Sequence, residues 1–196
     1  IHILPQMYQL REMKSELHGE QLQVMEESKD RCKAVQKSEG VETIMDHVTV
    51  NIGMIQGGVK RNVVADTAMA ELDVRVPIGI SHEAVMKKVD EIIKNSEIEG
   101  VYVTYDNPRG GNYVSVKDSI VTITQECVEE LLGIECAATY QWASSDTRYF
   151  RESGIATIQY GPSNTEGIHN YNETVNVADV ITACKIYAAL ILELVG

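Results

Sequence analysis

Basic residues and cysteines are both scarce in this sequence. Lysine and arginine number 17 against 29 aspartates and glutamates, so the formal net charge is −12. Because an acidic surface repels phosphate, nucleic acid is excluded as a general partner. The four cysteines form no C-x-x-C pair, and no histidine follows them at zinc-finger spacing. We therefore expect reduced and mostly buried thiols in a cytoplasmic protein.

Long hydrophobic runs and nucleotide-binding loops are also missing. The most apolar stretch, residues 186–195, is about half a membrane span and contains Glu193, so we expect a core-facing terminal helix and no membrane partner. There is no P-loop and no G-x-G-x-x-G, and Ser144 and Ser145 lie in no G-x-S-x-G nucleophile elbow. The apolar content of 44% excludes disorder, and 196 residues fit one large domain or two small ones.

The first half of the chain has the periodicities of a mixed α/β unit. The predicted elements are a helix over residues 3–17 that Gly19 ends or bends, strands over 48–55 and 64–76, a helix from the Ser81 cap to about Ser96, and a strand over 101–105. Residues 20–46 are charged and weakly periodic, so we expect a helical extension or a loop outside the core. This order predicts a ferredoxin-like β-α-β-β-α-β unit that lacks its first strand.

The second half, after a linker over residues 107–112, alternates helices and strands. Caps are expected at Ser115 with Asp118 and at Asn176 with Asp179. The predicted elements are helices over 120–133 and 145–153, strands over 135–141 and 155–160, and the terminal helix. Such alternation predicts half of an α/β sandwich with a parallel sheet.

A polar loop, residues 161–173, directly follows the last predicted strand. Open α/β sheets bind ligands just beyond the carboxyl ends of their strands. His169 in this loop therefore suits a metal or oxyanion site, and the alternative is a solvated loop with a surface histidine. A metal site needs three or more ligands, and the others are not evident in this sequence.

Two further places have both a functional and a structural interpretation. The turn at residues 144–148 precedes a helix, whose N-terminus can bind a carboxylate, but Ser145 can equally act as an ordinary cap. Arg75 shares the polar face of its predicted strand with Glu71 and Asp73. It forms either a surface ion pair or a guanidinium reserved for a substrate carboxylate.

Four stretches of the sequence form a recognisable set. They are Val50-Asn51-Ile52-Gly53-Met54-Ile55-Gln56-Gly57-Gly58 followed by Asn62-Val63-Val64, Leu72-Asp73-Val74-Arg75, Ser145-Asp146-Thr147-Arg148, and Tyr160-Gly161-Pro162 leading to His169-Asn170-Tyr171-Asn172-Glu173. Together they resemble one family of metallohydrolases, that of acetylornithine deacetylase, succinyl-diaminopimelate desuccinylase, aminoacylase and carboxypeptidase G. They occur in the family's order with family-like spacing and cover about residues 45–190.

The resemblance implies two domains and a metal centre. Residues 1–108 match most of a ferredoxin-like lid that also dimerises, and residues 109–196 match the C-terminal part of a phosphorylase/hydrolase-like α/β catalytic domain. The family holds two Zn²⁺ or Co²⁺ ions per subunit, and His169 matches its last metal ligand. Glu173 is expected either to contact the metal ligands without binding the metal itself or to have a purely structural role.

The resemblance also implies substrate-binding residues. Asn62 and Arg75 match lid residues that hold the substrate's carboxylate or the tetrahedral oxyanion, in some members across the dimer. Ser144, through its backbone, and Asn164 match positions that contact the substrate. The segment between Asn164 and His169 is one residue longer than in the desuccinylases, which weakens the match of Asn164. Ala65 replaces a proline that is usual in the family, which should be harmless.

The implied activity is hydrolysis of the amide bond of an N-acyl amino acid by a metal-activated water, in a homodimer joined through the lid. The family's H-x-D, bridging Asp, Glu-Glu pair, middle ligand and lid histidine are absent from the sequence. Because Ile1 stands inside a helical pattern, we expect these residues upstream of it and expect this chain alone to be inactive. The alternatives are a metallo-exopeptidase (carboxypeptidase or dipeptidase) and a non-catalytic dimerisation or binding module.

Overall fold

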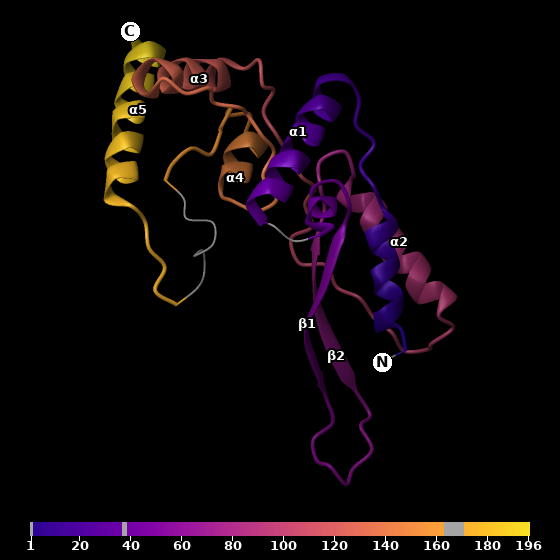
Figure 1. Ribbon diagram of the computed structural model, residues 1–196. Coiled ribbons are helices and arrows are strands. Elements are labelled where there is room, and N and C mark those ends of the chain that lie inside the picture. The colour runs from indigo at the N-terminus through magenta and orange to yellow at the C-terminus, as the bar shows by residue number, and fades with distance from the viewer. Residues whose placement is uncertain (1, 37–38, 163–170) are drawn as a thin grey trace. The chain divides into compact units, whose positions relative to one another are not determined.

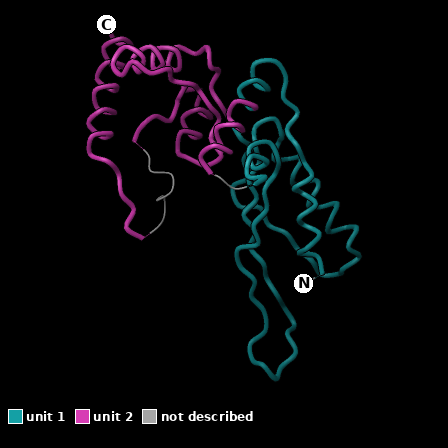
Figure 2. Tube along the Cα trace, in the orientation of Figure 1, with its two compact units in different colours: residues 1–25, 38–111 teal, residues 26–37, 112–196 magenta. Residues whose placement is uncertain are grey.

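The chain divides into two compact units. The computed structural model describes residues 2–36, 39–162 and 171–196. Unit 1 comprises residues 1–25 and 38–111, and unit 2 comprises residues 26–37 and 112–196 (Figure 2). The division at 111/112 lies close to the predicted boundary at 108/109, but residues 26–37 join the second unit. The identity of the units as lid and catalytic part stays a prediction.

A β-hairpin forms the centre of unit 1. Strands β1 (Thr49–Gly57) and β2 (Ala68–Arg75) are antiparallel, with Thr49 opposite Arg75 and Gly57 opposite Ala68 (Figure 1). The register shifts between Ile52 and Met54. Both strands were predicted, although β2 starts four residues later than its apolar pattern suggested. Val64, the first residue of the predicted strand, is instead exposed in the loop between the strands.

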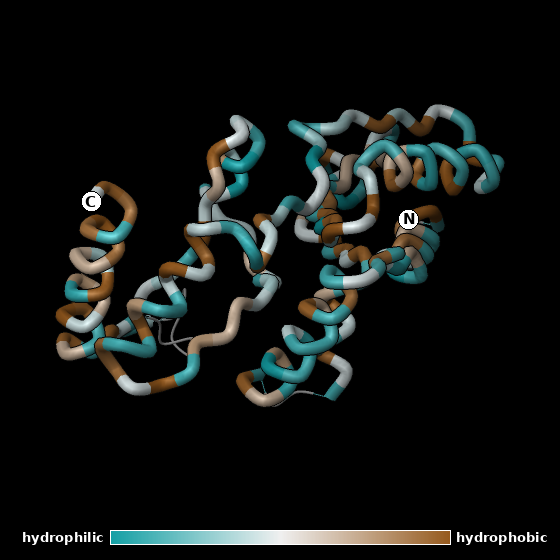
Figure 3. The backbone as a smooth tube through the Cα atoms, turned by 90° about the horizontal axis from the view of Figure 1, so that it is seen from above, coloured by the Kyte–Doolittle hydropathy of each residue, from teal (hydrophilic) through white to brown (hydrophobic). Residues whose placement is uncertain are grey.

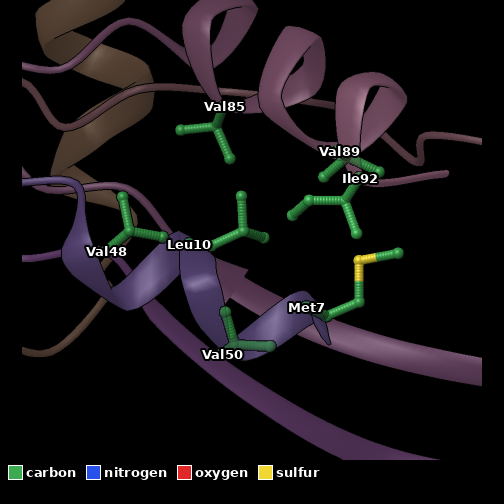
Figure 4. Close-up of a cluster of buried hydrophobic side chains, with 7 residues drawn as sticks. All are labelled: Met7, Leu10, Val48, Val50, Val85, Val89 and Ile92. Atoms are coloured by element: carbon green, nitrogen blue, oxygen red, sulfur yellow. The ribbon is translucent and has the colours of Figure 1, made fainter. Parts of the chain in front are cut away.

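The core of unit 1 lies between the first part of this hairpin and two helices. These are η1 (Leu4–Glu12), a 3-10 helix, and α2 (His82–Asn95). The buried side chains shown in Figure 4 are Met7, Leu10, Val48, Val50, Val85, Val89 and Ile92. Ser81 caps α2 as predicted, because its Oγ accepts a hydrogen bond from the backbone N–H of Ala84 at 3.1 Å. The apolar spacing along α2 therefore predicted both the helix and its buried face.

The first helix is shorter than predicted and gives way to extended chain. The backbone N–H of Val48 donates to the carbonyl of Met13 at 3.0 Å, and that of Ser15 donates to the carbonyl of Asp46 at 2.7 Å. Lys14 and His47 thus form an isolated antiparallel bridge at the start of β1. These bonds satisfy backbone groups at the sheet edge, which a helix continued to residue 17 would leave unpaired.

Residues 20–46 contain core elements, contrary to the expectation. Helix α1 (Gly19–Gln36) starts at the glycine that was predicted to end a helix, and η2 (Val41–Met45) follows later. Buried positions on α1 recur at about one helical turn, at Val24, Ser28 and Cys32. Because the middle position is a serine, the apolar repeat was not recognisable in the sequence.

Unit 2 contains two packed helices and a short third one, besides the last part of α1. Helices α3 (Ser119–Leu132) and α5 (Val177–Val195) enclose a small core, and α4 (Thr147–Glu152) lies between them in the sequence. The core consists of Cys127, Val128, Ile186 and Leu190, with Ile123, Cys136, Tyr160 and Ala189 against it. Asn176 caps α5 with its side chain, as predicted, whereas the cap of α3 is Asp118 itself and not Ser115, three residues earlier. Cys32 and Cys127 are buried and all four cysteines are free thiols.

Three predicted strands are not formed within the described part of the chain. Residues 101–105, 135–141 and 155–160 join no hydrogen-bonded ladder, so the expected parallel sheet is absent from residues 112–162 and 171–196. A strand needs a neighbouring strand to satisfy its backbone groups, and an apolar pattern alone cannot supply one. The predicted α/β class itself is confirmed, with helices packed on a small antiparallel sheet.

Helix α5 has apolar residues around most of its circumference, as the brown segments of the C-terminal helix in Figure 3 show. One side packs on α3 through Ile186 and Leu190, whereas Val177, Ile181 and Ile191 are exposed. Among the described residues, no helix is both long and apolar enough to cross a membrane.

Candidate functional site

Arg75 is the last residue of β2 and is held by a neighbouring carboxylate. Its Nε lies 3.1 Å from Oδ2 of Asp73, two positions earlier on the same face of the strand. Both side chains are more than half exposed, at 58% and 59%. The ion pair therefore contributes little to stability, and the guanidinium keeps further donors open to solvent.

Asn62 lies far from Arg75 within one chain. It is exposed in the loop that joins β1 to β2, whereas Arg75 lies at the opposite end of the hairpin (Figure 1). A strand as long as β2 spans about 24 Å at the usual rise per residue. A small ligand bound to one chain thus cannot contact both side chains at once.

The turn at residues 144–148 is fixed by side-chain hydrogen bonds. Nη1 of Arg148 donates to Oγ of Ser144 at 2.8 Å, and Nη2 donates to the hydroxyl of Tyr149 at 2.9 Å. Ser145 accepts a bond from the backbone N–H of Thr147 at 3.3 Å, which supports its interpretation as a local cap. Asp146 makes no side-chain cap for α4. Arg148 thus orients Ser144, the residue proposed to contact substrate.

Arg151 anchors α4 to the segments on either side, a role that the sequence did not indicate. Its Nε donates to the carbonyl of Thr157 at 2.7 Å, and its Nη1 lies 3.3 Å from Oδ1 of Asn112. Nδ2 of Asn112 in turn donates to the carbonyl of Arg148 at 3.0 Å. Burial lowers the pKa of the Arg151 guanidinium from its usual value. These contacts hold the turn at 144–148 beside residue 157.

The end of the segment 155–160 is also fixed. The hydroxyl of Tyr187 on α5 donates to the carbonyl of Tyr160, and the two rings pack edge to face with centroids 6.1 Å apart. Burial raises the pKa of the Tyr160 hydroxyl. Tyr160 is therefore held against α5 directly before the polar loop that begins with Gly161.

Two of the predicted site residues, Asn164 and His169, lie outside the described residues. Glu173 is described and is exposed. Across residues 2–36, 39–162 and 171–196, no group of three or more His, Cys, Asp or Glu side chains is placed to hold a metal ion. The described side chains therefore do not form a metal site on their own.

Sequence comparison identifies the class of unit 1. Residues 5–101 match the peptidase dimerisation domain of the M20 family. The chain is 25% identical over 144 residues to a succinyl-diaminopimelate desuccinylase of Nitrosococcus oceani, an alignment that covers 73% of this chain and 38% of the relative. Residues 5–101 thus carry the dimerisation domain of M20 peptidases, and the resemblance to this family of metallohydrolases that the sequence predicted is confirmed.

Two solved structures share the fold of this chain. The M20 metallo-carboxypeptidase Sso-CP2 of Sulfolobus solfataricus superposes with a TM-score of 0.68 at 14% identity, over 94% of this chain and 47% of that one. Human carnosine dipeptidase 1 superposes with a TM-score of 0.58 at 16% identity, over 97% of this chain and 44% of that one. The chain thus spans about two fifths of the curated relative and less than half of either solved chain.

Proposed function

We propose that the whole protein hydrolyses the amide bond of an N-acyl amino acid, of the acetylornithine or succinyl-diaminopimelate type. The observation that carries the proposal is the match to the M20 dimerisation domain over residues 5–101, together with a desuccinylase among the curated relatives. The proposed cofactors are two Zn²⁺ or Co²⁺ ions per subunit, which would activate the attacking water. His169 is the proposed ligand from this chain.

The residues of this chain would bind and orient the substrate. Arg75 is proposed to hold the free carboxylate, since its guanidinium is exposed and is tied to one carboxylate only through Nε. Asn62, Ser144 and Asn164 are proposed substrate contacts. Because Asn62 and Arg75 lie at opposite ends of the hairpin, they would contact the same small substrate only from different subunits.

A homodimer through the lid is proposed as the working assembly. The part of the hairpin farthest from the core exposes a run of apolar side chains, which here is called the hairpin tip patch. Such a patch on a dimerisation domain favours burial against a second copy. The patch consists of Met54, Ile55, Val59, Val63, Val64 and Met69.

The test is an assay of the whole protein with Zn²⁺ on N-acetyl and N-succinyl amino acids, with dipeptides in parallel. Acyl amino acid hydrolysis is expected to exceed dipeptide hydrolysis. Arg75→Met should raise KM by about tenfold or more, because a charge-assisted bond contributes about 1.5–3 kcal/mol. Lys94→Met, an exposed charge on α2, is the control and should leave KM unchanged.

The other outcomes decide between the alternatives. Faster cleavage of dipeptides would replace the deacylase proposal with an exopeptidase. A whole protein that binds no zinc and hydrolyses neither substrate would contradict catalysis and favour a binding module. The dimer is tested separately by sedimentation, where Ile55→Lys is expected to shift the mass to that of a monomer.

A further inference from the structure

The polar face of the hairpin carries charges of both signs beside the proposed carboxylate-binding residue. Strands β1 and β2 contain one basic residue, Arg75, and two acidic ones, Glu71 and Asp73. All three are exposed and occupy alternate positions of β2, so they share one face of the strand. Because two negative charges surround one positive charge, a substrate that carries only a carboxylate meets net repulsion here.

The ion pair on this face leaves groups of both signs open. Nε of Arg75 is bound to Oδ2 of Asp73 at 3.1 Å, and neither side chain makes another hydrogen bond or ion pair with a described residue. Both Nη groups of Arg75 and Oδ1 of Asp73 therefore remain available. The pair can accept a carboxylate and a cation at the same time.

The surface next to Asp73 is neutral and has room for a ligand. The residue opposite Asp73 on β1 is Asn51, which is exposed and uncharged. A Cβ on Gly53 would make only ordinary contacts, 3.7 Å from Nδ2 of Asn51 and 3.8 Å from the carbonyl oxygen of Glu71. No bulky side chain of β1 therefore fills the space beside these carboxylates.

The spacing of the two charged residues matches a basic side chain. In an N-acyl amino acid the α-nitrogen is an uncharged amide, so a cation must come from the side chain. Asp73 and Arg75 are alternate residues of a strand, which places their Cα atoms about 6–7 Å apart. The ammonium of an ornithine side chain reaches about 6 Å from its carboxylate carbon when extended.

We propose that Asp73 is a specificity-determining residue, which makes the site of Arg75 select N-acyl amino acids with a side-chain ammonium and a single carboxylate. This inference rests on the proposed function, in which Arg75 holds the substrate's carboxylate. The carboxylate binds the Nη groups, and the ammonium binds Oδ1 of Asp73. A second carboxylate, as in diaminopimelate, would face Glu71 and Asp73 without another basic residue in either strand. The net charge of −12 favours a cationic group further.

Binding to the whole protein tests the selectivity without turnover, after the metal has been removed. Calorimetry compares N-acetyl-L-ornithine with N-acetyl-L-norvaline, which has the same carbon chain without the ammonium, and with N-acetyldiaminopimelate. The ornithine derivative is expected to bind about two- to fivefold more tightly than either, as for an ion pair at an exposed site. Equal affinities, or no measurable binding of the ornithine derivative, would overturn the proposal.

Three variants assign the selectivity to Asp73. Asp73→Asn should reduce the preference for ornithine over norvaline to nearly one, whereas Asp73→Glu, which keeps the charge, should retain part of it. Glu71→Gln removes a charge from the same face and is the matched control, so it should leave most of the preference. An equal reduction in Asp73→Asn and Glu71→Gln would contradict the role of Asp73.

Activity measurements separate this inference from the proposed function. A whole protein that binds the ornithine derivative selectively but does not hydrolyse it with Zn²⁺ would defeat the proposed hydrolysis and leave the selectivity intact. Hydrolysis of the ornithine and norvaline derivatives with equal kcat/KM would support the proposed function and overturn the selectivity.

Discussion

Arg75 donates its Nε–H to Asp73 at 3.1 Å, on the solvent-facing side of β2. The proposed carboxylate-binding group is therefore already partly neutralised by its own strand. A substrate carboxylate must share the guanidinium with Asp73 or displace it. The strength of this intrastrand pair sets how strongly Arg75 attracts an anion.

Replacement of Asp73 by asparagine should strengthen carboxylate binding by the whole protein. The pair is mostly exposed and screened, so the expected gain is about 1.5- to fivefold in KM for an N-acyl amino acid. The gain should shrink as salt is added. Glu71→Gln, which removes a charge on the same face, is the matched control. An equal effect of both variants would show that the overall negative charge of this strand face, and not the specific pair of Asp73 with Arg75, weakens the binding of the carboxylate.

Asp46 is the buried carboxylate whose loss should destabilise unit 1. It is 3% exposed, and its Oδ1 lies 2.6 Å from Nδ1 of His47 while Oδ2 lies 3.8 Å from Nζ of Lys14. Asp46→Ala leaves these partners without their acceptor, so a loss of about 1–3 kcal/mol in unfolding free energy is expected. Urea denaturation measures it, and Asp66→Ala in the exposed hairpin loop should stay within about 0.5 kcal/mol.

Tyr105 should make the stability of the chain decrease in strongly alkaline solution. Burial, with the bond to Asp90 and its negative charge, raises the pKa of Tyr105 from 10.0 to about 12. The folded state favours the neutral phenol, so this contribution is complete below pH 10 and is lost as the pH rises toward about 12. Tyr105→Phe should therefore flatten the pH dependence of the unfolding free energy over this range. The exposed Tyr102→Phe should not.

Arg148 should control the order of the turn that contains Ser144. Arg148→Met removes the bonds to Ser144 and Tyr149, so backbone amides of residues 142–146 should exchange about three- to tenfold faster. Arg148→Lys should restore only part of the protection, because one ammonium cannot reproduce the planar fork. Arg31→Met, an exposed arginine on α1, is the control. Unchanged exchange in Arg148→Met would contradict the positioning role.

The elements predicted best are those whose signals are local. Helix α2 has an amphipathic repeat and a serine cap, and α5 begins at the predicted Asn176 cap. The strands that failed depend on partners instead. Residues 155–160 have a strong β pattern, but a ladder also needs a neighbouring strand. A helical extension was one of the two expectations for the region of α1, but its burial was not expected, because Ser28 occupies a buried position within its apolar repeat.

The sequence predicted which residues belong to the candidate site, but not how far apart they lie in the structure. Likeness to the family indicated Arg75, Asn62 and Ser144, and local spacing placed Arg75 on a polar strand face. Only the pairing of Thr49 with Arg75 reveals that Asn62 lies at the other end of the hairpin. Arg151 anchors α4 by donating to the backbone carbonyl of Thr157. Because every residue has such a carbonyl, no sequence motif predicts this contact.

The assignment of residues 26–37 to unit 2 has a practical consequence for dividing the protein. Within unit 2, the hydroxyl of Ser28 accepts a hydrogen bond from the backbone N–H of Tyr140 at 2.8 Å. If the chain were cut at residue 112, the C-terminal piece would lack both this acceptor and the buried Cys32. One cleavage therefore cannot yield two intact halves, and any exchange of modules between homologues must transfer two separate stretches together.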